Sequence, residues 1–81
     1  MYNLFGAILA GQKKLDEAIV YFEKSIQISP NYADAYNNLA GVLADQKKYN
    51  KAIEYFEKAI QIKPNLFEAY YNLGNTLSAI E

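Results

Sequence analysis

Apolar residues recur along this chain at the spacing of an α-helix and not with the alternation of a β-strand. They lie three or four positions apart on one side of each segment, and charged residues occupy the opposite side. The clearest stripes consist of Ala35, Tyr36, Leu39, Ala40, Val42 and Leu43, and of Ala52, Ile53, Phe56, Ala59, Ile60 and Ile62. Along the whole sequence the pattern predicts five helices, over residues 2–12, 16–29, 33–46, 50–63 and 67–80.

Two kinds of turn separate the predicted helices. Pro30 and Pro64 have no backbone N–H and crowd the preceding helical turn, so the helices before them must end there. Lysine pairs at 13–14 and 47–48 mark the other two turns. Because the two kinds alternate, the sequence predicts helical hairpins that are joined by proline-containing connections.

The sequence also repeats itself with a period of 34 residues. At that offset about half of the comparable positions are identical, which is far above chance, so the chain is an array of repeats. Tyr-Phe-Glu-Lys at 21–24 returns at 55–58, and a third, partial copy begins near Phe67. If neighbouring hairpins pack side by side, Phe22 and Phe56 must both be buried between them.

The composition excludes most catalytic and metal-binding chemistry. The 81 residues include no Cys and no His, which removes disulfides, thiolate or imidazole metal sites and the common nucleophile systems. We therefore expect no enzyme activity, no metal and no cofactor. Asp16 and Glu17 favour the start of a helix through its dipole rather than acting as a general acid or base.

The charge balance and the hydropathy narrow the range of partners further. A net charge of −1 creates no strong field for nucleic acid or for an anionic membrane, so neither is expected as a partner. The longest weakly polar run, at 1–11, is far shorter than a membrane span. The absence of cysteine fits a reducing compartment, and a cytoplasmic location is expected.

These features resemble the tetratricopeptide repeat, a 34-residue helix-turn-helix unit. The residues that carry the family pattern are Tyr2, Phe5, Gly6, Leu9, Ala18, Phe22 and Pro30, then Tyr36, Leu39, Ala40, Leu43, Ala52, Phe56 and Pro64, then Tyr70, Leu73, Gly74 and Leu77. The resemblance implies an all-α fold of five helices, A-B-A-B-A, whose helix-turn-helix repeats stack as a right-handed α-solenoid. It divides a single domain, 1–81, into a partial repeat 1–32, a full repeat 33–66 and a half repeat 67–81.

Two departures from the family pattern leave the assembly open. The family commonly has glycine in the turn between its two helices, where a left-handed backbone is needed, but this chain has Lys13 and Lys47. Either the turn forms with lysine at positive φ, or the two helices fuse and exchange with another chain. No polar capping helix is visible, and a following helix against which Tyr70, Leu73, Leu77 and Ile80 would normally pack in part is missing, so the ends are expected to expose apolar surface. Such ends indicate end-to-end association, a piece of a longer array or an engineered repeat.

By the same resemblance, the first helix of each unit lines a concave groove that holds extended peptides. The candidate groove residues are Asn3, Asp34, Asn37, Asn38, Asp45, Glu68, Tyr71, Asn72 and Asn75. Asn38 and Asn72 share one repeat position and are expected to stack as a ladder whose amides pair with a peptide backbone. The ladder is similar to that of O-linked N-acetylglucosamine transferases, although Leu4 interrupts it in the first unit. Alternatively, both amides are solvated helix side chains without a ligand.

A second binding mode of the family is not supported by the residues. Chaperone-tail binders grip a terminal carboxylate with a clamp of basic residues and asparagines, and the matching positions here are Asn3, Ala7, Asn38, Glu68 and Asn72. Only Asn38 agrees with the clamp, and Glu68 would repel a carboxylate. The negative charges of Glu68, Asp34 and Asp45 together favour a neutral or basic peptide over an acidic one.

The sequence thus predicts a non-catalytic protein–protein interaction module that binds an extended peptide or a partner protein on its concave face. The alternative is a structural or engineered scaffold that self-associates, through its uncapped ends or by helix exchange, into a homo-oligomer. The light scattering of the free protein and its binding of peptides distinguish the two.

Overall fold

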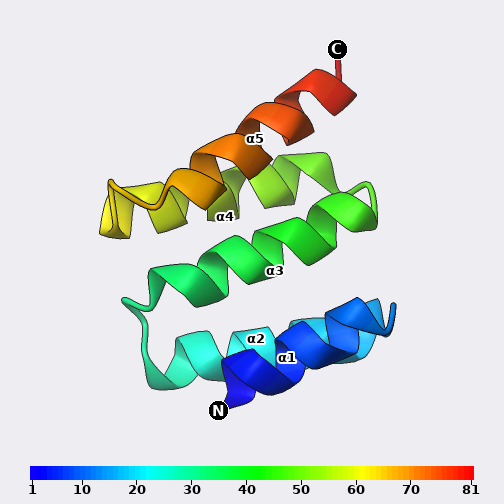
Figure 1. The fold of residues 1–81 in the computed structure, drawn as a ribbon, viewed down its shortest axis with the longest axis vertical. Helices are drawn as coiled ribbons and strands as arrows, with labels where there is room; N and C mark the ends of the chain where they lie inside the picture. The colour runs from blue at the N-terminus through cyan, green and yellow to red at the C-terminus, as the bar shows by residue number, and fades with distance from the viewer.

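A computed structural model describes residues 1–81 and consists of five α-helices without a strand (Figure 1). The helices are α1 (Tyr2–Gly11), α2 (Leu15–Ile28), α3 (Ala33–Asp45), α4 (Tyr49–Ile62) and α5 (Phe67–Ala79). Each predicted helix is present, and every predicted boundary lies within one residue of the observed one. None of the five is both long and apolar enough to cross a membrane.

The lysine turns fold back, so the two helices of each hairpin do not fuse. Lys13 and Lys47 both adopt a φ of 64°. Lys14 N–H donates to the Leu9 carbonyl at 2.9 Å, and the equivalent bond after α3 runs from Lys48 N–H to the Leu43 carbonyl at 2.8 Å. These bonds form the Schellman motif, which supplies partners for the last carbonyl groups of a helix. The hydrogen bonds therefore offset the backbone strain of a lysine in the left-handed region.

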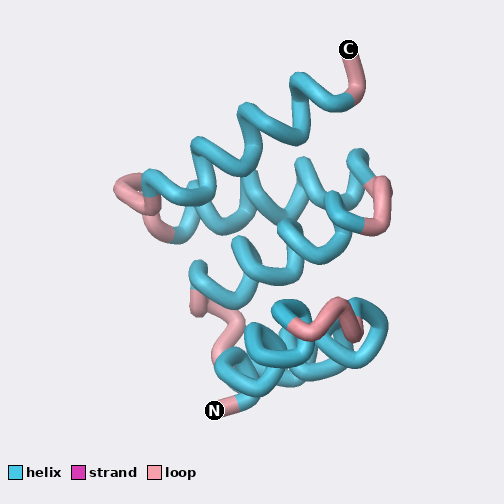
Figure 2. Tube along the Cα trace, turned by 45° about the vertical axis from the view of Figure 1, so that its right-hand side comes forward, coloured by secondary structure: helices cyan, strands magenta, loops and turns pink.

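The proline connections are also repeated. Tyr32 N–H donates to the Ser29 carbonyl at 3.0 Å, and Leu66 N–H donates to the Lys63 carbonyl at the same distance. In Figure 2 these short loops join the helices at the edge of the stack opposite the lysine turns. The chain therefore folds as hairpins α1–α2 and α3–α4, followed by α5.

The hairpins stack in order, with α3 between α2 and α4. We call α1, α3 and α5 the first helices and α2 and α4 the second helices. Neighbouring first helices contact each other, whereas α2 and α4 do not. The first helices consequently lie closer together than the second helices, which makes their face the inner face of a curved array.

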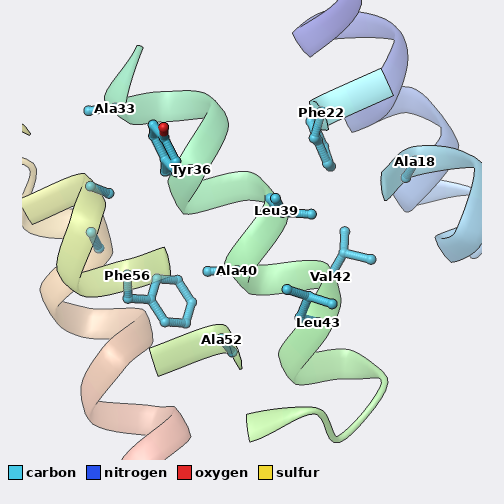
Figure 3. Close-up of a cluster of buried hydrophobic side chains, with 12 residues drawn as sticks. Ala18, Phe22, Ala33, Tyr36, Leu39, Ala40, Val42, Leu43, Ala52 and Phe56 are labelled. Atoms are coloured by element: carbon cyan, nitrogen blue, oxygen red, sulfur yellow. The ribbon is translucent and has the colours of Figure 1, made fainter. Parts of the chain in front are cut away.

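The core lies on both sides of α3 (Figure 3). Phe22 of α2 packs on one side and Phe56 of α4 on the other, and both rings are 1% exposed. The burial that the repeat pattern required of these two phenylalanines is thus confirmed. Alanines at 18, 52 and 59 are completely buried, since a small side chain allows adjacent helices to approach closely.

Candidate functional site

A cleft of about 420 Å³ opens on the face formed by the first helices. It runs across all three first helices, because α1, α3 and α5 all contribute side chains to its wall. Phe22 and Phe56 reach it from the second helices. The lining consists of Ala7, Ala10, Phe22, Asn37, Asn38, Gly41, Val42, Ala44, Asp45, Phe56, Glu68, Asn72, Asn75 and Thr76.

The structure brings most of the predicted groove residues together in this cleft. Those that line it are Asn37, Asn38, Asp45, Glu68, Asn72 and Asn75. Asp34 and Tyr71 do not line it, and the Tyr71 side chain is 71% exposed. Asn3 is also outside the lining, but it is hydrogen-bonded to a residue within it.

The asparagines connect neighbouring first helices by bonds that recur with the sequence period. Asn38 Nδ2 donates to Asn3 Oδ1 at 2.9 Å between α3 and α1. One unit further, Asn72 Nδ2 donates to Asn37 Oδ1 at 3.3 Å between α5 and α3. Asn38 and Asn72 therefore make equivalent bonds, each to the preceding first helix, one repeat apart.

Asn37 is the buried centre of this arrangement. Its side chain is 4% exposed, and its Nδ2 donates to Glu68 Oε1 at 3.1 Å while its Oδ1 accepts from Asn72. Since a buried amide without partners is destabilising by about 1–3 kcal/mol, these two bonds hold α3 and α5 in register. Asn37 thus acts first as a structural link between the helices that form the cleft.

All charged side chains that line the cleft are negative. Asp45 and Glu68 line it, and none of the eight lysines does. Two of the lysines pack elsewhere on aromatic rings: Lys24 Nζ lies 5.6 Å from the ring centres of Tyr2 and Tyr21, and Lys51 Nζ lies 6.0 Å from that of Tyr55. The cleft therefore presents acidic and amide groups without a compensating cation.

Some lining residues were missed by the sequence analysis. Thr76 is 4% exposed, and its Oγ1 donates to the Asn72 carbonyl at 2.9 Å, one turn earlier in α5. Its repeat equivalent, Val42, also lines the cleft. The spacing could have indicated both, because Val42 lies four residues after Asn38 and Thr76 four residues after Asn72, on the same side of their helices. Burial of a hydroxyl at this position, however, depends on the packing of α5.

The polar groups of the cleft are ones that donate and accept hydrogen bonds. No group of three or more carboxylate, imidazole or thiolate side chains is close enough to hold a metal ion. Its polar groups are amides and single carboxylates, which donate and accept hydrogen bonds.

A comparison with protein families agrees with this geometry. The family model described as "Tetratricopeptide repeat" matches residues 1–65 and again residues 31–81, so it covers the whole chain. No curated protein matches the sequence.

Three solved structures match the fold of nearly the whole chain. YrrB, a tetratricopeptide-repeat protein with an unusual peptide-binding site, has a TM-score of 0.90 and 25% identity over 98% of this chain. MamA has a TM-score of 0.91 and 32% identity over 96%. The TPR2B domain of yeast Sti1, in its pHsp70 complex, has a TM-score of 0.95 and 26% identity over 98%. This chain covers only 41%, 46% and 63% of their respective lengths.

Proposed function

We propose that this chain, which belongs to the tetratricopeptide-repeat family of protein–protein interaction modules, binds an extended peptide segment in the cleft on its first helices. The observation that carries the proposal is the cleft itself, which spans α1, α3 and α5 and collects six of the nine predicted groove residues. The peptide-binding site of YrrB and the pHsp70 complex of Sti1 are consistent with it. In this role the chain has no catalytic step, and its expected setting is the cytoplasm.

The ligand we propose is a neutral or basic segment. Asp45 and Glu68 would repel an acidic peptide, and no lysine is available in the cleft to neutralise one. Because both carboxylates are exposed to solvent, each contributes modestly to affinity and mainly selects against the wrong ligand.

Gly41 offers a direct test of the cleft. An added Cβ at Gly41 would meet no atom within 4 Å, and this residue lines the cleft, so a side chain there starts in open space beside the proposed ligand. Gly74 also has free space around it but does not line the cleft. We expect Gly41→Phe to weaken binding of a random octapeptide library at least about tenfold and Gly74→Phe to leave it unchanged. Equal binding by both variants would refute the cleft as the binding site.

A second role, self-association, is favoured by apolar surface at both ends of the array. Phe5 and Ile8 of α1 are 48% and 50% exposed, and Tyr70, Leu77 and Ile80 of α5 are 47%, 42% and 47% exposed. Contact between such faces of two copies would bury these side chains. Light scattering at micromolar concentration tests whether the chain self-associates. A monomeric molecular mass excludes assembly, whereas an average molecular mass that increases with protein concentration supports it.

A further inference from the structure

We infer that Glu68 sets the direction of the hydrogen bonds in the cleft and thereby makes it selective for an arginine side chain. This inference rests on the proposed peptide-binding function and adds the residue that determines specificity. Its basis is the chain of bonds from Glu68 through Asn37 to Asn72, in which each member determines the orientation of the next.

The chain of bonds starts at a group that can only accept. The ionised Glu68 carboxylate has no proton to donate, so the Asn37 amide must turn its NH2 group toward it, at 3.1 Å. The Asn37 oxygen then faces the other way and accepts from Asn72 Nδ2 at 3.3 Å. The Asn72 NH2 group is consequently directed at Asn37, and the Asn72 oxygen is directed away from it.

Together with Asn38, whose amide is oriented separately by its bond to Asn3, this leaves an excess of acceptors in the cleft. No side-chain hydrogen bond of the protein ends on Asn72 Oδ1 or on Asn38 Oδ1, because both residues direct their NH2 groups at the preceding helix. Each amide has thus used one of its two hydrogens and kept both lone pairs of its oxygen. The carboxylate of Asp45 and the second oxygen of Glu68 add further acceptors, and the cleft contains no cationic side chain.

Arginine fits this set of acceptors better than other side chains do. Its planar guanidinium has five N–H donors and a permanent positive charge, so it can bond to an amide oxygen and a carboxylate at the same time. Lysine supplies the charge with three donors at a single point. Citrulline, the neutral analogue of arginine, keeps the shape but not the charge, and glutamate would bring only acceptors.

The experiment compares Glu68→Gln with Glu57→Gln, which removes the same charge from the exposed surface of α4, away from the cleft. The probes are capped, fluorescent octapeptide pools in which one position is fixed as arginine, lysine, citrulline or glutamate. We expect the unaltered protein and Glu57→Gln to bind the arginine pool about tenfold more tightly than the citrulline pool, and Glu68→Gln to lose most of that preference.

The outcomes separate this inference from the proposed function. If pools bind and Gly41→Phe abolishes binding, but arginine has no advantage or Glu68→Gln keeps it, the inference is wrong and the proposed function stands. If no pool binds, or if binding survives Gly41→Phe, both fail. Loss of the arginine advantage in Glu68→Gln alone supports both.

The orientation of the amides can be tested without a ligand. The side-chain NH2 resonances of Asn37 and Asn72 in an NMR spectrum report the bonds that these groups make. We expect both to shift in Glu68→Gln, since glutamine can donate as well as accept, and neither to shift in Glu57→Gln. A change at Asn37 without one at Asn72 would contradict the transmission of direction from one amide to the next.

Discussion

Helices α3 and α5 have the same residues at several repeat positions but very different surroundings. Tyr36 of α3 is 9% exposed, and its equivalent in α5, Tyr70, is 47% exposed. Leu43 is 6% exposed, whereas Leu77 is 42% exposed. Eight residues of α3 are buried, but only Ala69 and Thr76 of α5 are.

The difference arises from the neighbours of each helix. α3 packs between α2 and α4, so apolar side chains on both of its flanks are covered. α5 packs mainly against α4, and the flank that carries Tyr70 and Leu77 faces solvent. The comparison shows that the apolar pattern determines which side chains are available for packing, and that the stack determines which of them are buried.

Removing the same leucine from the two helices should give the largest contrast. We expect Leu43→Ala to lower the free energy of unfolding by about 3 kcal/mol, because it leaves a cavity in the core. Leu77→Ala should lower it by less than about 1 kcal/mol, since this side chain is already half exposed. Urea unfolding followed by circular dichroism measures both. Equal losses would mean that the flank of α5 is covered in solution.

Adding a methyl group at the same repeat position in α1 and α5 should change the stability of the protein in opposite directions. A Cβ at Gly6 would lie 2.6 Å from the Phe22 ring, so Gly6→Ala should destabilise the fold by about 1–2 kcal/mol. A Cβ at Gly74 meets nothing within 4 Å, so Gly74→Ala should stabilise the protein by about 0.5–1 kcal/mol through helix propensity. Thermal unfolding of the two variants tests the prediction, and stabilisation by both would contradict it.

The ends of the two helices provide the smallest expected effect. The C-cap residues are alike, with a φ of −84° at Gln46 and −99° at Ile80, but the turn after α3 continues through Lys47 at a φ of 64°. Lys47→Gly should raise the stability by about 0.5 kcal/mol, because glycine adopts positive φ without strain. Lys48→Gly, at a φ of −90°, is the control and should not stabilise. A gain from Lys48→Gly and none from Lys47→Gly would indicate that the turn is unstrained.

Much of the fold could be predicted from local properties of the chain. The apolar spacing located five helices to within one residue, because helical periodicity and the two prolines act over a few neighbouring residues. The repeat of 34 required Phe22 and Phe56 to be equivalent and buried, and both are 1% exposed. Whether the lysine turns fold back or continue as one straight helix could not be predicted from the sequence. Lysine by itself favours the straight helix, and only tertiary contacts stabilise the folded turn.

The amino-acid sequence by itself therefore determined the helices, their order and the face that each presents to its neighbours. Only the tertiary structure decided the partners of the cleft amides, because Asn37 and Glu68 are 31 residues apart and meet only where α3 approaches α5. It also left Asn3, Asp34 and Tyr71 outside the lining of a cleft to which the family resemblance had assigned them. Helical periodicity assigns a residue to a face, whereas a hydrogen bond requires its two atoms to come within about 3 Å, which depends on how the helices pack.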